Sequence, residues 1–180
     1  MMKKPGFKLQ KGIIIPGFII AITLTGGFTT PLEAQNEADE YKLQVGAAAG
    51  FSTGYGLSFR YWPANWGVQA AFGPYYDSDG PIISMGITGL RLIEDNGWSR
   101  FFFYVGNHLF INSIPEYSDM SSHYTIKTVT TYIFGMGPGL EFLIRRRLGI
   151  NLMFGIAAYM NNDDQSQTNL TGETGIFYRF

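Results

Sequence analysis

Beyond residue 40, apolar residues recur at every second position instead of at the three-to-four-residue spacing of a helix. In segment 41–51, for example, Leu43 and Val45 alternate with Gln44 and Gly46. Comparable alternation covers segments 55–62, 66–73, 82–93, 139–144, 150–159 and 173–180, and the continuous apolar segment 100–112 adds one more. The pattern therefore predicts an all-β fold of eight strands.

Each predicted strand has one face of large apolar residues and one face of small or polar residues. The four longest segments, 41–51, 82–93, 100–112 and 150–159, have 10–13 residues. A tilted strand needs about this length to cross a bilayer, whereas soluble sandwiches use strands of about 5–6 residues. We expect the apolar face to point outward. In 82–93 the pattern is less regular, and we place Arg91 inward with Leu90 and Leu92 outward. Segment 100–112 is apolar on both faces, so its facing is not determined.

The predicted connections are of two kinds that alternate along the chain. Short turns lie at Pro63–Asn65, Glu94–Ser99 and Arg145–Leu148, and the opposite connections are Ser52–Gly54, Tyr75–Pro81, Ser113–Val129 and Asn161–Asn169, two of which are long and polar. An even number of antiparallel strands brings both termini to one end. Closure of the sheet pairs every edge, which hydrocarbon requires. The sequence thus predicts a closed, up-and-down, transmembrane β-barrel with the polar loops outside.

The N-terminal segment has the organisation of a secretory signal. Lys3, Lys4, Lys8 and Lys11 precede an uncharged apolar run from Gly12 to Gly27, and Ala34 is a suitable small residue for cleavage. The run is short for a spanning helix, which needs about 20 residues; an uncleaved inner-membrane anchor is the alternative. We expect a cleaved signal peptide at 1–34, a short linker at 35–40 and the barrel at 41–180.

The chain ends on a strand that alternates to its last residue. Ile176, Tyr178 and Phe180 share the apolar face, and Glu173 and Arg179 have the opposite parity. Together with Arg60-Tyr61-Trp62-Pro63 and Gly137-Pro138-Gly139-Leu140-Glu141-Phe142, this ending resembles the small eight-stranded bacterial outer-membrane β-barrels of the OmpA/OmpX-like, porin-like group, over residues 40–180. The resemblance implies that Ile176, Tyr178 and Phe180 are an assembly signal read by the barrel assembly machinery. It also implies an outer-membrane location with both termini in the periplasm.

Charged side chains on the predicted inner face should form a network in the lumen. They are Lys42, Arg60, Arg91, Glu141, Glu173 and Arg179. Eight strands enclose a space that side chains just fill, so these charges must pair or keep water. Strand direction places Glu141 level with the cations, and we predict that it faces Arg60. Glu173 lies roughly 20 Å along its strand from the terminus. A plugged lumen is the main interpretation, and a narrow conducting path is the alternative.

Composition and motifs argue against most other functions. Four of the 13 basic residues and one of the 14 acidic residues precede Gln35, which leaves the mature chain with a net charge of about −4 and argues against nucleic-acid binding. The chain contains no Cys and two His, so we expect no disulfide, no metal site and no cofactor. Gly135-Met136-Gly137-Pro138-Gly139 lacks the spacing and the following helix of a nucleotide loop. We interpret Arg145-Arg146-Arg147 as a solvated turn near lipid headgroups.

A hydrolase is the remaining chemical alternative. Asp119, Ser121, Ser122 and His123 lie in the longest predicted loop, and His108 lies near the top of the fifth strand. A Ser–His hydrolase also needs a third group that orients the base, and no lipid A deacylase motif is present. We therefore predict a monomeric, non-enzymatic outer-membrane barrel with a structural or surface-interaction role. Its expected partners are membrane lipids, the assembly machinery and an unknown surface ligand. A low-conductance pore is the first alternative, and a lipid-modifying enzyme is the second.

Overall fold

The computed structural model of the chain describes residues 42–77, 80–117, 124–161 and 166–180. These residues form eight strands: β1 (Leu43–Gly50), β2 (Gly56–Tyr61), β3 (Trp66–Asp77), β4 (Gly80–Asp95), β5 (Ser99–Tyr117), β6 (Tyr124–Ile144), β7 (Leu148–Asn161) and β8 (Ser166–Arg179). No helix in this described part of the chain is long and apolar enough to cross a membrane. The predicted signal peptide (1–34) and linker (35–40) lie outside the described residues.

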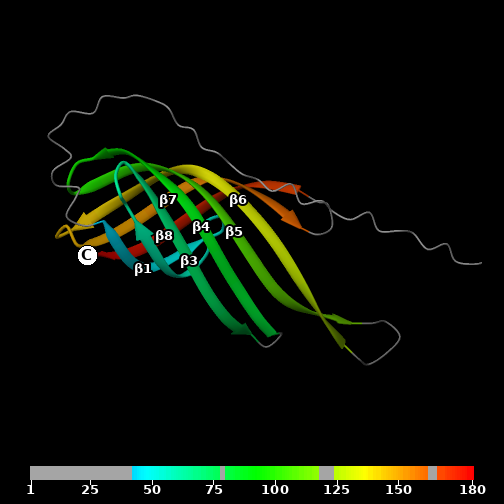
Figure 1. The fold of residues 1–180 in the computed structure, drawn as a ribbon. Helices are drawn as coiled ribbons and strands as arrows, with labels where there is room; N and C mark the ends of the chain where they lie inside the picture. The colour runs from blue at the N-terminus through cyan, green and yellow to red at the C-terminus, as the bar shows by residue number, and fades with distance from the viewer. Residues whose placement is uncertain (1–41, 78–79, 118–123, 162–165) are drawn as a thin grey trace, which may run out of the picture. The chain divides into compact units, whose positions relative to one another are not determined.

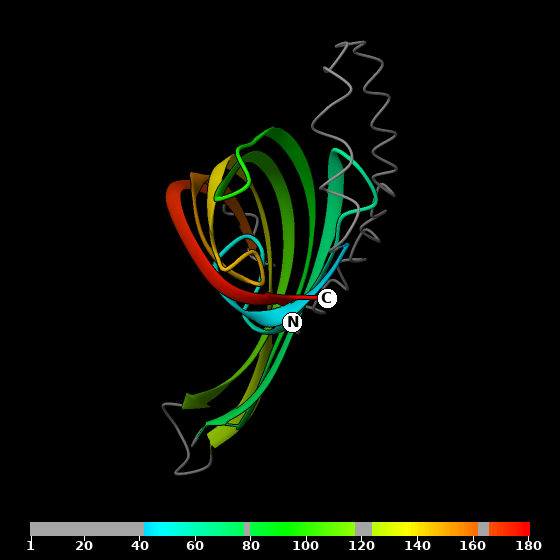
Figure 2. The same ribbon diagram turned by 90° about the vertical axis from the view of Figure 1, so that its left-hand side faces the viewer.

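The strands close into one barrel in chain order, and each strand pairs antiparallel with the next (Figure 1). The ring of strands is visible in Figure 2. β1 closes the ring on β8, with a register that runs from Gln44↔Arg179 to Gly50↔Glu173. The predicted fold class is confirmed. We call the end with the short turns at 62–65, 96–98 and 145–147 the turn end, and the opposite end the loop end.

The two faces of the wall differ as the alternation predicted. On β7, Phe154 and Ile156 are 62% and 53% exposed on the outside, whereas Asn151 and Met153 are fully buried in the lumen. The same parity is confirmed in β1, β2, β3, β8 and the end of β6. A soluble barrel would place its large apolar residues inside, so this outer surface is suited to a hydrocarbon environment.

The predicted facing of β4 is wrong at Arg91. Leu90 points inward and is buried, and Arg91 is exposed on the outer face, opposite Trp66 of β3. Leu90 packs in an apolar cluster with Trp62, Phe102, Tyr104 and Met153. Burial of Leu90 in this cluster outweighs the cost of placing a charge on the apolar outer face. That cost is small because a long arginine side chain can keep its stem on the apolar surface and its guanidinium in a polar layer. Arg91 therefore does not belong to the lumen charge network.

The structure also sets the facing of β5, which the sequence left open. Arg100, Phe102, Tyr104 and His108 point inward, and Phe101 and Phe103 point outward. Phe102 and Tyr104 are fully buried and belong to the apolar cluster. Both faces of this strand are apolar because one face contacts the apolar cluster and the other forms part of the outer surface.

Three of the four connections at the loop end are shorter than predicted, and their strands are correspondingly longer. Ser113–Val129 was expected to be a loop, but cross-strand pairing between β5 and β6 continues to Tyr117↔Tyr124. β3 and β4 likewise pair up to Asp77↔Gly80, and β8 begins at Ser166. Threonine and serine are polar enough to suggest a loop, yet β-branched threonine favours extended backbone. The tips at 78–79, 118–123 and 162–165 lie outside the described residues.

Candidate functional site in the barrel lumen

A buried ion pair lies in the lumen near the turn end. Nη1 of Arg60 donates to Oε1 of Glu141 at 2.9 Å, and both side chains are fully buried. Arg60 also donates to Oε1 of Gln69 from Nε at 3.0 Å and from Nη2 at 2.6 Å, and its Nη1 lies 3.5 Å from Oε1 of Gln44. The guanidinium lies 3.9 Å from the centre of the Phe177 ring. The arginine is thus bound by a carboxylate, by two amides and by an aromatic face.

Arg100 extends this cluster toward the turn end. Its Nε donates to Oδ2 of Asp95 at 2.7 Å, and its Nη1 lies 3.9 Å from the second oxygen of Glu141. The guanidinium carbon is 5.8 Å from the centre of the Trp62 ring. We call Gln44, Arg60, Gln69, Arg100 and Glu141 the lower network. Its members come from β1, β2, β3, β5 and β6, so the network crosses the interior of the barrel at this level.

The six predicted lumen residues do not all lie together. Arg60 and Glu141 meet as expected, and Arg179 is buried on the inner face of β8. Lys42 is half-buried just before β1. Glu173 is buried higher in the lumen, where its hydrogen-bond donors are uncharged. Arg91 lies on the outer face, as described above.

The connection between β1 and β2 folds into the lumen, contrary to the prediction of an outward loop at Ser52–Gly54. Ser52 and Thr53 are 0% and 1% exposed. The backbone N–H of Ser52 donates to Oε1 of Glu173 at 3.2 Å, and the hydroxyls of Ser52 and Thr53 both donate to the same carboxylate. The hydroxyls of Tyr104 and Thr171 each lie 3.4 Å from Oε1 of Glu173. The inward carboxylate stabilises the inward fold of the loop, because a buried carboxylate needs hydrogen-bond donors and the loop supplies three of them.

A histidine and a serine bind the ends of the same loop. Nδ1 of His108 lies 2.7 Å from the carbonyl oxygen of Phe51, and Nε2 lies 2.8 Å from Oγ of Ser84. Because a carbonyl only accepts, Nδ1 carries the proton, and in the neutral imidazole Nε2 then accepts from the serine. The N–H of Tyr55 donates to Oγ of Ser84 at 3.0 Å. We call Phe51–Tyr55 the plug, and Ser84, His108 and Glu173 its anchors.

The Ser84–His108 contact has the form of a nucleophile and its base, but both residues are buried beneath the plug. The carbonyl of Phe51 orients the imidazole as a third group would. In this structure both residues are bonded to the loop, His108 to the carbonyl of Phe51 and Ser84 to the N–H of Tyr55. Asp119, Ser121, Ser122 and His123, the other residues of the hydrolase hypothesis, lie outside the described residues. Among the described residues, no three His, Asp or Glu side chains group as a metal site.

Glycines on three neighbouring strands make room for the plug. A Cβ at Gly86 of β4 would collide with the carbonyl of Thr53, and one at Gly106 of β5 would meet the carbonyl of Ser52. A Cβ at Gly135 of β6 would collide with the side chain of Ser52. Part of the glycine-rich segment 135–139 therefore serves to admit a loop into the barrel.

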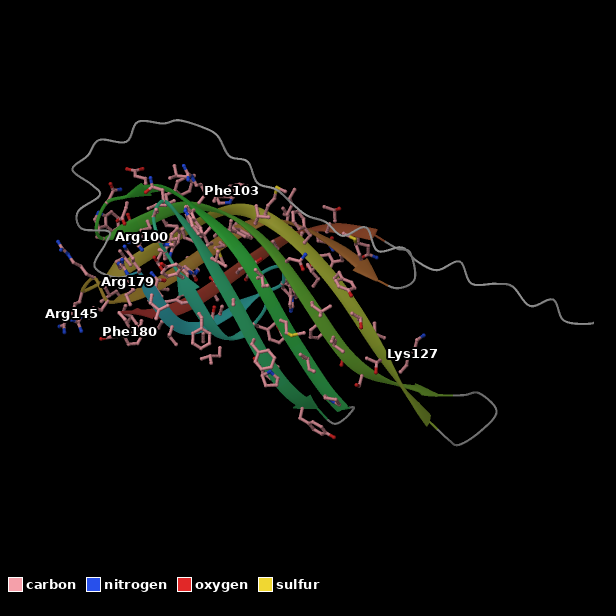
Figure 3. All side chains as sticks on the ribbon, in the orientation of Figure 1. Arg100, Phe103, Lys127, Arg145, Arg179 and Phe180 are labelled. Carbon is pink, nitrogen blue, oxygen red and sulfur yellow. The ribbon has the colours of Figure 1, made fainter. Side chains whose placement is uncertain are left out.

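The predicted assembly residues lie together on the outer face of β8 at the turn end. Ile176, Tyr178 and Phe180 are all exposed, and the rings of Tyr178 and Phe180 are 5.1 Å apart and nearly perpendicular. The N–H of Phe180 donates to the carbonyl of Leu43 at 2.9 Å, so the seam with β1 is paired to the last residue. Figure 3 shows Phe180, Arg179 and Arg145 at this end of the barrel.

Sequence reasoning missed Arg100 and the entire plug. Arg100 is directly opposite Glu141 in the β5–β6 register, so a facing for β5 chosen to pair these charges would have found it. The plug had a weaker signal, namely a short polar loop beside an inward carboxylate without a cation at its level.

Comparison with solved structures agrees with this architecture. The N-terminal β-barrel domain of Pseudomonas aeruginosa OprF superimposes with a TM-score of 0.50 at 14% identity, over 77% of this chain and 95% of that domain. The chain has the fold of the small outer-membrane β-barrels. Ail of Yersinia pestis (TM-score 0.47, 16% identity, 77% and 96% covered) and Neisserial surface protein A (0.43, 12%, 77% and 94%) are also similar. No protein-family model and no curated protein sequence matches the chain.

Proposed function

We propose that this protein is an integral outer-membrane barrel that presents the β5–β6 hairpin at the cell surface as a binding edge for an extended segment of a partner protein. Both termini lie in the periplasm, and the lumen is closed in the resting state. The observation that carries the proposal is the unpaired edge of β6 above the barrel rim. The apolar outer wall and the outer-membrane fold support the location.

The β5–β6 hairpin extends beyond its neighbours at the loop end (Figures 1 and 2). Pairing of β4 with β5 stops at Ile83↔Ile111, and pairing of β6 with β7 stops at Thr131↔Asn161. Between these points and the tip, each strand of the hairpin pairs only with the other in the described structure. The backbone groups on the outer edge of Tyr124–Thr130 thus have no ladder partner among the described residues and can pair with another strand.

The edge of β6 is the best suited of the open edges to accept a strand. Proline interrupts the open edges of β3, β4 and β5, at Pro74, Pro81 and Pro115, and removes a donor from each strand. The open part of β8, Ser166–Gly172, contains Asn169 and Gly172, which are poor strand formers. Tyr124–Thr130 has no proline, and five of its residues are β-branched: Thr125, Ile126, Thr128, Val129 and Thr130.

The exposed Lys127 indicates the chemistry of the partner. It is the one charged residue of Tyr124–Thr130 and is labelled on the protruding part of β6 in Figure 3. A lysine on an edge strand discourages self-association, because antiparallel pairing centred on it would bring two like charges together. A partner strand with an acidic residue opposite Lys127 gains a favourable cross-strand pair. The geometry therefore favours an acidic, extended peptide segment over a second copy of this chain.

The proposal is tested with random peptides displayed on phage and selected against the folded protein in lipid nanodiscs. The informative variant replaces residues 113–128 with Asn-Gly, which joins the cross-strand partners Asn112 and Val129 by a two-residue turn. Peptides selected on the unmodified protein should lose binding to this trimmed barrel. Amide hydrogen exchange should slow at 124–130 when a selected peptide is bound.

The matched control shortens the proline-containing hairpin of β3 and β4, replacing residues 74–83 with Asn-Gly between the partners Gly73 and Ser84. Binding should survive this change. Equal binding to both trimmed barrels, or selected peptides that protect some other segment, would show that the β6 edge is not the binding surface. A Lys127→Glu variant should shift the selection from acidic to basic peptides.

A further inference from the structure

We propose that the plug, Phe51–Tyr55, is displaceable, and that its release opens a vestibule at the loop end to water and small cations. The vestibule is lined by the anchors Glu173, His108 and Ser84 and by Tyr104. Below it, the apolar cluster and the lower network keep the turn end closed. This goes beyond the surface role proposed above and does not depend on it.

The contacts of the plug are of a kind that can exchange with water. β1 ends at Gly50 and β2 begins at Gly56, so the plug is absent from the backbone ladder of the barrel. Its ends are held through side-chain hydrogen bonds to Ser84, His108 and Glu173. Water can replace each of these bonds at modest net cost. The lower network differs, because its charges are surrounded by packed rings and amides.

The chain around the plug is built to bend without disturbing the wall. Gly54 and Gly56 have φ angles of +82° and +119°, which other residues rarely adopt, and they form a hinge on one side of the plug. On the facing wall, Gly86, Gly106 and Gly135 present backbone to the loop. No wall side chain has to change rotamer at these three positions for the loop to leave.

Displacement would change what Glu173 binds. In the closed form it accepts from the backbone of Ser52 and from the hydroxyls of Ser52 and Thr53. Without them it keeps the hydroxyls of Tyr104 and Thr171, each 3.4 Å from Oε1. These two uncharged donors leave most of its charge to be met by water or a cation. The vestibule should therefore admit positively charged solutes in preference to negatively charged ones.

Because the chain contains no cysteine, one introduced thiol can be labelled selectively. The accessibility of such a thiol in the lumen to a soluble reagent tests the proposal directly. Ala157→Cys places a single thiol on the inner face of β7, opposite Gly135, where the alanine is 1% exposed. We call this thiol the lumen probe. The protein is folded into lipid vesicles, and the labelling rates of a trimethylammonium and a sulfonate methanethiosulfonate reagent are measured. Thr128→Cys on the exposed part of β6 serves as the accessible reference.

Two variants release the plug in different ways. Gly86→Ala adds a Cβ that collides with the carbonyl of Thr53, and His108→Ala removes an anchor without adding volume. Gly89→Ala is the matched control, because it lies on the same strand but points outward, with the carbonyl oxygen of Val105 its nearest neighbour at 3.9 Å. The temperature-dependent gel shift of a closed barrel identifies the variants that have folded.

We expect the lumen probe to be protected in the otherwise unchanged protein and in Gly89→Ala, and labelled in Gly86→Ala and His108→Ala. Labelling should be faster with the cationic reagent, and Glu173→Gln should abolish that preference. If the lumen probe reacts as fast as the reference with the plug intact, the loop does not close the lumen. If every folded releasing variant keeps the probe protected, or if the two reagents react equally in the open variants, the displaceable plug with an anionic vestibule is refuted.

Discussion

Neutralising Glu141 should destabilise the barrel far more than neutralising Glu173, although both carboxylates are buried in the same lumen. Glu141 is paired with Arg60 at 2.9 Å, and neither side chain is exposed, so solvent does not screen the pair. Glu141→Gln keeps an acceptor for Arg60 but leaves the guanidinium without its counter-ion. Breaking a buried pair costs about 3–5 kcal/mol, and the retained acceptor places the expected loss near the lower value, about 3 kcal/mol.

Glu173→Gln removes a buried charge whose donors are uncharged: one backbone N–H and the hydroxyls of Ser52, Thr53, Tyr104 and Thr171. The glutamine keeps a carbonyl that accepts from these groups, and its amide can donate to a hydroxyl. We therefore expect a change of less than about 1 kcal/mol. Both variants replace a carboxylate with an amide of the same size, so each is the control for the effect of the substitution itself.

Equilibrium unfolding by urea in lipid vesicles measures both losses. Arg60→Met or Glu141→Met alone should also destabilise the barrel. The double variant with both changes should recover most of that loss, because a packed apolar pair often replaces a buried ion pair without net cost. If Glu141→Gln and Glu173→Gln both unfold at the urea concentration of the unmodified protein, the lower network is hydrated, and the argument for a closed turn end fails.

Other parts of the barrel lead to four more predictions. An unboiled sample in detergent should migrate differently from a boiled one, because every strand of a closed barrel is paired; identical migration would contradict the fold. Phe180→Ala should lower assembly in cells much more than Leu170→Ala on the same outer face of β8, while the refolded proteins remain equally stable; equal assembly would remove the role of the terminal ring. Leu90→Ala should cost about 2–5 kcal/mol and Arg91→Ala less than about 0.5 kcal/mol by urea unfolding, and the reverse order would restore the original facing of β4. An epitope inserted after Ser121 should be labelled on intact cells, and one inserted at the turn end, after Asn96, should not; the opposite result would invert the topology.

Much of this barrel is readable from its sequence because strand periodicity reports directly on which face is apolar. The alternation along β7, from Ile150 to Ile156, needs no knowledge of the neighbours, since lipid lies on one side and the lumen on the other. The Arg60–Glu141 pair was also accessible, because strand direction alone places both residues near the turn end. Where the period failed, at Leu90 and Arg91, the facing depended on an apolar cluster to which β5 and β7 contribute, and only the assembled barrel contains that cluster.

The plug shows why the upper lumen could not be derived in the same way. A strand residue faces in or out by parity, but a loop has no parity, and Ser52 and Thr53 would suit solvent as well as they suit the lumen. What draws them inward is Glu173, more than a hundred residues later in the chain, and what admits them is a set of glycines on β4, β5 and β6. Taken singly, each glycine would be interpreted as a residue that lets the sheet curve. Only their common level in the closed barrel, opposite the carboxylate, indicates that they leave space for a segment of the chain itself. The lumen is therefore occupied in two ways. Near the turn end it holds side chains that point inward because of their position in the strand alternation. Near the loop end it holds the backbone of a loop, which enters because a buried charge requires donors.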